Sequence, residues 1–243
     1  MPRTKPLGRI YHEATKITPA GVPADQGWPR PPYPPPFKTY PGPQIPLPPP
    51  QYQGLTLEQA LRARRSWRDF TAQPLPLAAL GQLLFAAQGF TGQRRGRPLR
   101  AAPSAGALFP YEVYVLAHRV EGLAPGAYHY DPRAHSLTQV RAGDLRALVA
   151  HIGLDQEHLA TAAAVFALSA VVDRVRAKYG ERGWRYIYME AGHISQNIYL
   201  QATSLGLGSV AVGAFYDDAL NALLGLDGEH ETAMYLHAVG PLG

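Results

Sequence analysis

The sequence predicts an α+β protein with one central, mostly antiparallel sheet flanked by helices. Two observations lead to this prediction. Strand-like and helix-like segments are mixed along the chain without the strict alternation of a βαβ protein, and two short strand-like segments are joined by a tight Asp-Pro turn. A chain of 243 residues, of which 46% are hydrophobic and 17% charged, has the composition of a globular protein.

Proline sets the N-terminal part of the chain apart. Sixteen of the 24 prolines precede residue 51, and their density from Pro29 to Pro50 excludes a helix or an interior strand there. We therefore expect residues 1–50 to form an extended arm and residues 51–243 to form the folded domain. The arm is a disordered linker, a polyproline ligand for another protein, or an ordered strap on its own domain.

The end of this arm contains the tetrapeptide Pro49-Pro50-Gln51-Tyr52, which matches the PPxY ligand of WW domains. So short a motif also arises by chance in a proline-rich tract. A non-enzymatic interaction protein that recruits WW or SH3 domains through its arm is one functional hypothesis.

Two helices are predicted at the start of the domain. Thr56 and Gln59 have the spacing of a capping box, which satisfies the first backbone amides of a helix. The second helix begins near Pro76 and ends at Gly89, because proline favours the first turn of a helix and glycine its end. Its apolar residues recur at helical spacing: Leu77, Leu80, Leu83, Leu84 and Ala87.

Strands follow in the middle of the chain. Residues 112–118 form the first predicted strand, and residues 127–130 and 136–140 form a hairpin around Asp131-Pro132. Residues 164–172 are apolar enough to form a fully buried strand.

The clearest single element is a helix over residues 184–205, where apolar residues recur every three or four positions up to a terminal glycine. Residues 209–215 predict a strand. Asp217 then predicts the cap of a short helix that ends near Gly225, and residues 233–239 predict the last strand.

The composition excludes several classes of chemistry. The chain contains no cysteine, so thiol catalysis, disulfides and cysteine-ligated metals are excluded, and redox chemistry requires a bound cofactor. It also lacks the His-Glu-x-x-His pattern of zinc enzymes, and we expect no metal site. The net charge of +5 comes from scattered basic residues, so we expect no nucleic-acid partner.

Membrane association is not expected either. The longest apolar run, residues 159–172, is too short to span a bilayer, and the N-terminus has no apolar signal segment. The sequence therefore predicts a cytoplasmic protein.

A cluster of arginines follows the first predicted helix, between residues 62 and 70. On a helix end, Arg64 and Arg68 stand one turn apart on the same side, so that two guanidinium groups and the Ser66 hydroxyl converge on one phosphate. This pattern predicts an anion site. A solvated basic face is the alternative.

Small residues between two prolines form a second candidate, from Ala102 to Pro110. They predict a rigid loop whose backbone approaches a flat ring closely, or else a plain turn before a strand. The loop is not a hydrolase elbow, because the Gly-x-Ser-x-Gly motif requires a glycine at position 102. Gly206 and Gly208 are not a dinucleotide-binding fingerprint, because they follow a helix where that motif needs a strand.

Four segments, in this order, resemble the SagB-type dehydrogenases of the nitroreductase superfamily. They are RRSWRDF, APSAGALFPYEVYV, EGLAPGAYHYDP and KYGERGWRYIYMEAGHISQNIYLQATSLGLGSVAVGAF, and YHEATK at residues 11–16 resembles the arm of that subgroup. The resemblance covers essentially the whole chain. It implies the nitroreductase-like fold, FMN as the cofactor, and an intertwined homodimer in which both subunits hold each flavin.

The resemblance also implies roles for particular residues. The segment that binds the FMN phosphate and ribityl chain is matched by Arg64, Arg65, Ser66 and Arg68. The loop that covers the flavin from the other subunit is matched by Pro103, Ser104, Ala105 and Gly106. The strand beside the flavin rings is matched by Val210, Ala211, Val212, Gly213 and Ala214. Two departures stand out: many nitroreductases carry a glutamate where this chain has Gly213, and a basic residue that often follows the last strand is missing.

Lys178 and Tyr179 match the Lys-Tyr pair of the peptide-heterocycle oxidases within this group. Oxidation of an azoline to an azole removes a hydride and a proton, so a base is needed beside the flavin, and we expect this pair to be catalytic. An exposed lysine beside a packing tyrosine is the alternative. Two substrate classes stay open: NADH or NADPH reduces small nitro or quinone compounds through the flavin, or a modified peptide gives up the hydride and oxygen accepts it.

Overall fold

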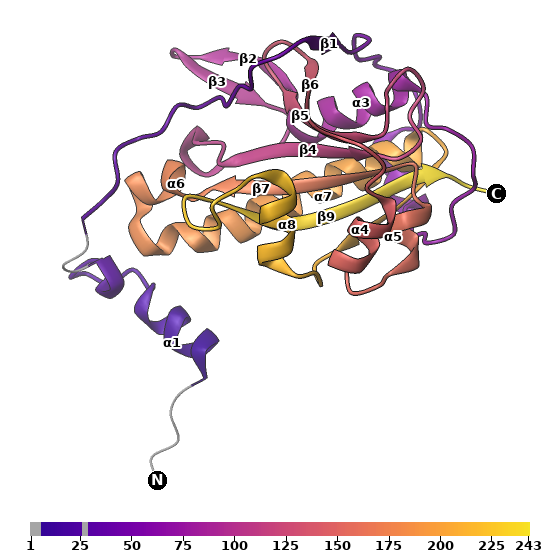
Figure 1. Cartoon of the computed structure of the whole chain (residues 1–243). Coiled ribbons are helices and arrows are strands. Elements are labelled where there is room, and N and C mark those ends of the chain that lie inside the picture. The colour runs from indigo at the N-terminus through magenta and orange to yellow at the C-terminus, as the bar shows by residue number, and fades with distance from the viewer. Residues whose placement is uncertain (1–5, 26–28) are drawn as a thin grey trace.

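The computed structural model describes residues 6–25 and 29–243. Seven strands form one sheet in the order β1-β6-β5-β4-β7-β9-β8, and each neighbouring pair is antiparallel (Figure 1). The strands are β1 (Gln44–Pro46), β4 (Tyr111–Ala117), β5 (Gly126–Asp131), β6 (Ser136–Ala142), β7 (Ala164–Val171), β8 (Leu207–Val212) and β9 (Glu231–Pro241). The predicted α+β class, with a central antiparallel sheet flanked by helices, is confirmed.

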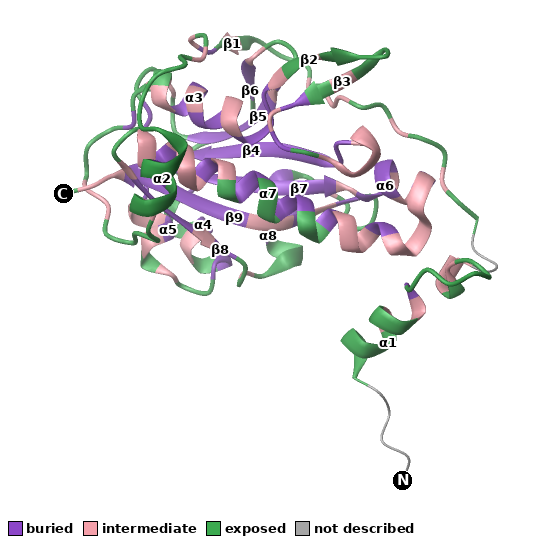
Figure 2. Cartoon of the chain, turned by 180° about the vertical axis from the view of Figure 1, so that it is seen from behind, coloured by how far each residue is buried: buried purple, intermediate pink, exposed green. Residues whose placement is uncertain are grey.

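Helices cover both faces of this sheet (Figure 1, Figure 2). One face carries α2 (Leu57–Ala63), α3 (Leu77–Gln88), α6 (Val172–Tyr179) and α7 (Gly183–Ser204). The other face carries α4 (Arg146–Ile152), α5 (Glu157–Thr161) and α8 (Asp217–Leu224). A separate hairpin of β2 (Phe90–Arg94) and β3 (Arg97–Arg100) lies beside the main sheet, and α1 (Leu7–Ala14) lies apart from it, near one end of α7.

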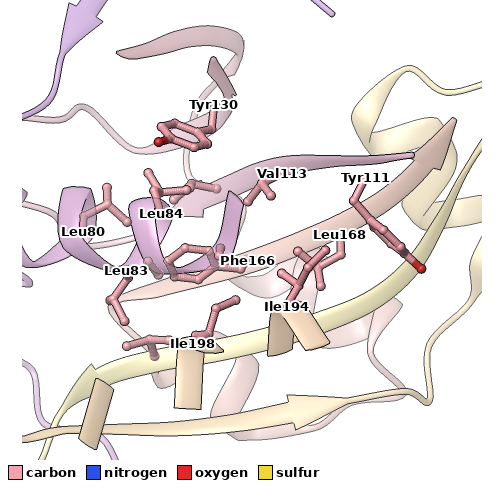
Figure 3. Packing of buried hydrophobic residues seen from close by; sticks show 14 of the residues in the cluster. Leu80, Leu83, Leu84, Tyr111, Val113, Tyr130, Phe166, Leu168, Ile194 and Ile198 are labelled. Carbon is pink, nitrogen blue, oxygen red and sulfur yellow. The ribbon is translucent and has the colours of Figure 1, made fainter. Parts of the chain in front are cut away.

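The larger core fills the space between the sheet and helices α3 and α7. Figure 3 shows leucines of α3 and isoleucines of α7 gathered around Phe166 of β7, which is completely buried. Full burial of such a side chain contributes about 1.5–3 kcal/mol of stability. Because the stripe of α7 meets both the sheet and α3, this helix is held along most of its length.

Several predictions from local sequence signals are confirmed. Thr56 and Gln59 make the capping box of α2 in both directions. Pro76 precedes α3 and Gly89 follows its last residue. In the hairpin between β5 and β6, the Asp131 carboxylate accepts hydrogen bonds from two backbone amides of the turn, which fixes its geometry.

Three local predictions were wrong in detail. The first helix ends at Ala63, because Arg64 already has an extended ψ of 126°, so Arg64 and Arg68 do not stand one helical turn apart. The residue before α8 is Tyr216, and Asp217 is its first helical residue, without a side-chain cap. Strand β8 ends at Val212, short of residue 215, because β9 pairs with it only to that position.

Several short elements were not predicted: α1, β1, α4, α5, α6 and the strands β2 and β3 are among them. Helix α1 lies inside the arm that was expected to be extended. Each of these elements is eight residues or shorter, so its period alone gives little signal. The hairpin turn places Arg95 and Gly96 in the left-handed region, with φ of 50° and 74°.

Residues 35–51 of the proline-rich segment lie against the folded body, and we call this stretch the strap. The Arg174 Nε donates to the Pro35 carbonyl at 2.7 Å, and an Arg100 Nη donates to the Pro36 carbonyl at 2.8 Å. Further along, β1 adds an edge strand to β6, and Leu47 is buried. Of the predicted arm, residues 1–5 and 26–28 lie outside the described residues.

Candidate functional site

The candidate phosphate segment runs along the outer edge of β8. The Trp67 amide donates to the Ser209 carbonyl at 2.9 Å, which holds the segment beside the last strand of the sheet. From this position the exposed Ser66 hydroxyl lies 3.0 Å from the hydroxyl of Tyr199 on α7. The Arg64 guanidinium carbon lies 5.1 Å from the centre of the Tyr199 ring, a cation–π distance.

Tyr199 also reaches β8 itself. The Ala211 amide donates to the Tyr199 hydroxyl at 2.8 Å, so a single phenol oxygen joins the predicted phosphate segment to the predicted ring-lining strand. We call Arg64, Ser66, Tyr199 and Ala211 the edge cluster. Tyr199 was not predicted as a site residue, because an amphipathic helix offers many polar positions and no local motif distinguishes one of them.

The other two arginines of the segment point elsewhere. An Arg65 Nη donates to the carbonyls of Arg62 and Arg64 at 3.1 and 2.8 Å, which caps the C-terminal end of α2. Arg68 and His158 of α5 line a hollow on the opposite face of the sheet. Burial lowers the pKa of His158, and the charge of Arg68 lowers it further. The structure therefore brings Arg64 and Ser66 together but not Arg68.

The pleat of β8 decides which of its amides are free. Ala211 donates away from β9, to Tyr199, whereas its neighbours Val210 and Val212 face the β9 ladder. Gly213 and Ala214 follow the end of the strand and are exposed. Within the described part of the chain neither of their amides donates a hydrogen bond, so both amides are accessible to a ligand.

The second predicted loop forms a tight turn next to Lys178 and Tyr179. Ser104 Oγ accepts the Phe109 amide at 2.8 Å, which closes the loop. Gly106 has a φ of 65°, and a Cβ added there would lie 2.7 Å from the Tyr179 hydroxyl and 2.8 Å from the Lys178 ammonium. Both side chains of the predicted catalytic pair therefore reach the same glycine, although neighbours on a helix diverge by about 100°. Pro103 is exposed and Ala105 half-buried beside them.

A buried ion network anchors the helix that carries this pair. Arg174 of α6 forms a 2.6 Å ion pair with Glu112 of β4, and His129 of β5 lies 2.8 Å from the same carboxylate. Arg174 also donates to the Phe109 carbonyl at 3.1 Å. The network thus fixes α6 and the end of the loop relative to the sheet.

Glu190 of α7 lies beneath the loop and is only 2% exposed. Burial raises its pKa to about 7, and the nearby Ser104, Arg100 and Gln88 oppose this shift only in part. One of its carboxylate oxygens has no hydrogen-bond partner within the described residues. Glu190 was not predicted as a site residue. The signal that could have revealed it is a glutamate next to Ala191, within the apolar stripe of the long helix.

The edge cluster and the loop lie at different points along α7. Glu190 and Tyr199 are nine positions apart, which corresponds to about 13 Å along the helix axis. In the part of the chain that the structure describes, no hydrogen bond or ion pair joins the two groups. They do not converge within one chain.

Residues 6–25 and 29–243 contain neither a metal-type cluster nor a membrane-spanning helix. No cluster of three or more histidine or acidic side chains has the arrangement of a metal site there. No helix in those ranges combines the length and the apolar character needed to cross a bilayer.

Comparison with known proteins identifies the family of this chain. Residues 61–241 match the sequence profile of the Nitroreductase family. The chain belongs to the nitroreductase family. It is thereby an oxidoreductase, and the fold described above is the nitroreductase fold.

Individual relatives agree with this membership. The nitroreductase-like protein MJ1384 of Methanocaldococcus jannaschii is 42% identical over 175 residues, which cover 72% of this chain and 87% of that protein. A solved nitroreductase-like structure from Ralstonia eutropha JMP134 superposes with a TM-score of 0.70 at 30% identity, over 82% of this chain and 90% of that chain.

The SagB-type resemblance also has support among relatives. The microcin B17-processing protein McbC of Escherichia coli is 29% identical over 143 residues, which cover 57% of this chain. The chain spans about half of McbC, 53% of its length.

Proposed function

We propose that this nitroreductase-family chain is an FMN-dependent oxidoreductase of the SagB type that works as a homodimer. One observation carries the proposal: the Tyr199 hydroxyl joins Ser66 of the predicted phosphate segment to Ala211 of the predicted ring-lining strand. Two segments that the resemblance assigns to one cofactor are thus neighbours in space.

The residues at this edge fit the chemistry of FMN. Arg64 has no carboxylate partner within the described residues, so its charge is available to a phosphate. The amides of Gly213 and Ala214 are available to a polar ring edge. When bound, FMN supplies hydride transfer at its ring system.

We propose a homodimer because the edge cluster and the loop lie apart within one chain. Because the edge cluster and the loop from Pro103 to Gly106 do not converge within one chain, we propose that the loop of the partner subunit covers the flavin bound at the edge cluster. The amides of Gly213 and Ala214 would hold the rings, and Arg64 and Ser66 the phosphate. We keep Arg65 and Arg68 as proposed contributors to phosphate binding, with a smaller share because their guanidinium groups point away from Ser66.

Lys178 and Tyr179 are the proposed acid–base pair. Their convergence on Gly106 places a lysine nitrogen and a phenol oxygen beside the loop that is proposed to cover the flavin. With the Lys178 side chain as the neutral amine, such a pair can take the proton that an azoline loses together with its hydride. The likeness to McbC, which is named as a microcin-processing protein, supports a modified peptide as the hydride donor.

NADH or NADPH as reductant for a small-molecule acceptor is the second substrate class. The likeness to MJ1384, which is named as a nitroreductase, supports a nitro compound as that acceptor. We also propose that residues 1–50 are an arm that straps the domain of residues 51–243. Tyr52 is 87% exposed, but recruitment of WW or SH3 domains through it is not favoured as the function of this chain. Membership of the nitroreductase family already indicates an oxidoreductase.

The absorption spectrum of the purified protein tests the proposal. Flavin bands that persist through desalting support it, and a chain that stays colourless after incubation with FMN contradicts it. Anaerobic addition of NADH or NADPH then separates the substrate classes, because bleaching by either identifies a nicotinamide reductant.

For the peptide class, Lys178→Ala should abolish azoline oxidation while FMN stays bound. Lys16→Ala is a suitable control, because its ammonium is exposed and contacts only Glu13 among the described residues. Full azoline oxidation by the Lys178→Ala protein would remove Lys178 from the mechanism.

A further inference from the structure

The ring of Tyr199 has two close neighbours. The Arg64 guanidinium carbon lies 5.1 Å from the ring centre, and the His237 imidazole meets the ring edge-on, with ring centres 4.4 Å apart at an angle of 67°. His237 is completely buried and is held by Ser195 Oγ at 2.9 Å from its Nδ1. Burial lowers the pKa of His237 to about 3, so this imidazole is neutral and adds no charge to the cluster.

The hydroxyl of Tyr199 has one hydrogen, and its two neighbours determine where that hydrogen points. The Ala211 amide is only a donor, so at 2.8 Å the phenol oxygen must accept from it. The phenol hydrogen is then free for the second neighbour, Ser66 Oγ at 3.0 Å. A phenol hydrogen lies in the ring plane, and no other acceptor is hydrogen-bonded to this hydroxyl within the described residues.

This arrangement sets the direction of the Ser66 hydroxyl as well. When Ser66 Oγ accepts from Tyr199, its own hydrogen is directed away from α7, and Ser66 is exposed on that side. Arg64 packs on the ring of the same tyrosine, two positions before this serine in the chain. A hydroxyl donor and a guanidinium that both contact one tyrosine suit a phosphate, whose oxygens accept hydrogen bonds from both groups.

We propose that Tyr199 is a positioning residue that holds Ser66 as a hydrogen-bond donor and Arg64 beside it, for the phosphate of the bound flavin. This inference rests on the proposed function, since it takes FMN to bind at the edge cluster. It adds a residue that acts on the phosphate through Ser66 and does not touch the flavin rings. Loss of the Tyr199 hydroxyl therefore weakens recognition of the phosphate and leaves recognition of the rings unchanged.

A comparison of FMN with riboflavin tests this directly, because riboflavin has the same rings and lacks the phosphate. The measurement is the Kd of each flavin for the full-length apoprotein, from the quenching of flavin fluorescence. For Tyr199→Phe we expect FMN to bind about three- to tenfold more weakly, the range of one neutral hydrogen bond, and riboflavin to bind as tightly as to the wild type. Phenylalanine keeps the ring that contacts Arg64 and His237, so the fold should be retained, which thermal unfolding of the apoprotein verifies.

The double variant Tyr199→Phe, Ser66→Ala shows whether Tyr199 acts through Ser66. In a chain that already lacks the serine hydroxyl, removal of the tyrosine hydroxyl should weaken FMN binding no further. Tyr128→Phe is the matched control, because it removes a phenol that donates to the Ala124 carbonyl at 2.7 Å in a hairpin away from β8, and it should leave both Kd values unchanged.

Each outcome decides the proposal. Equal losses of FMN and riboflavin affinity in Tyr199→Phe, an unchanged FMN affinity, or additive losses in the double variant would overturn the positioning role and leave the proposed FMN function intact. A wild-type chain that binds neither flavin would instead overturn the proposed function, and this inference with it.

Discussion

Arg174 on α6 lies 2.6 Å from the carboxylate of Glu112 on β4, and both side chains are almost completely buried. The pair joins the helix that ends in Lys178 and Tyr179 to the centre of the sheet. Burial raises the pKa of Glu112, but the hydrogen bond with His129 and the charges of Arg174 and Arg100 outweigh this effect and leave its pKa below the ordinary value.

The Glu112→Gln variant should therefore be strongly destabilised. It removes one charge and leaves the Arg174 guanidinium buried without compensation, which costs about 3–5 kcal/mol in the free energy of unfolding. Urea denaturation followed by circular dichroism measures this quantity. The control is Glu13→Gln, whose pair with Lys16 is exposed and should contribute little to stability. Similar losses in both variants would show that the buried pair is not a special source of stability.

Glu190→Gln should change stability in a pH-dependent way. Because the folded-state pKa of Glu190 is about 7, above its ordinary value of 4.5, the folded chain retains a proton that the unfolded chain releases between these values. The wild type thus loses stability as the pH rises through this window, and glutamine does not. We expect the variant to be more stable at about pH 8, by up to about 3 kcal/mol, and no more stable at about pH 5. A stability difference that is the same at both pH values would contradict the assignment; Glu58→Gln, on an exposed surface, serves as the control.

The strap should contribute to stability through Leu47. This side chain is 7% exposed and packs into the larger core. Leu47→Ala should lower the free energy of unfolding by about 2–3 kcal/mol, measured by urea denaturation. Leu7→Ala, at a position that is 84% exposed, should change it by less than about 0.5 kcal/mol. If Leu47→Ala is as mild as Leu7→Ala, the strap is a loosely attached segment.

Deletion of residues 1–50 extends the same test to function. Loss of the strap removes the β1 edge from β6 and the carbonyl partners of Arg100 and Arg174. We expect a lower melting temperature and weaker retention of FMN on desalting. A truncated protein with the melting temperature and flavin content of the full chain would instead favour an arm that serves a partner protein.

Arg64→Ala should weaken FMN binding more than Arg65→Ala does. A charge-assisted hydrogen bond contributes about 1.5–3 kcal/mol, so loss of the Arg64 guanidinium should raise the Kd about 10- to 150-fold. Arg65 is occupied with the carbonyls at the end of α2, so its removal should have a smaller effect on the Kd. Fluorescence titration of each apoprotein gives both values. Equal effects would mean that Arg65 turns toward the phosphate when the cofactor binds.

Much of the fold was accessible from the sequence, because its signals are local. The capping box at Thr56 and the Asp131 turn each depend on residues at most three positions apart. The apolar stripe of α7 repeats every three or four positions over the whole helix, so its prediction was correct to within one residue at each end. Short elements such as α6 were missed where no cap or turn motif marked them, because a segment of eight residues shows too little of its period.

The site was accessible only as separate segments. Motifs pointed to the residues around Ser66, Ser104 and Lys178, but the motifs did not show that Arg65 caps α2 and Arg68 faces α5. These two arginines point away from Ser66 because the chain leaves the helix at Arg64 and passes along the edge of β8. The hydrogen bond between Trp67 and Ser209 fixes this path.

The sequence by itself determined the secondary structure of the longer elements, the proline-rich character of the arm and the dependence of any redox chemistry on a bound cofactor. Only the tertiary structure decided that Tyr199 meets Ser66 and Ala211, and that Lys178 and Tyr179 share Gly106. The physical reason is the range of the interactions. Helix caps and turns are formed by neighbours in the chain, whereas a contact between residues 133 positions apart forms only after strands pair in one particular order and a helix packs across them.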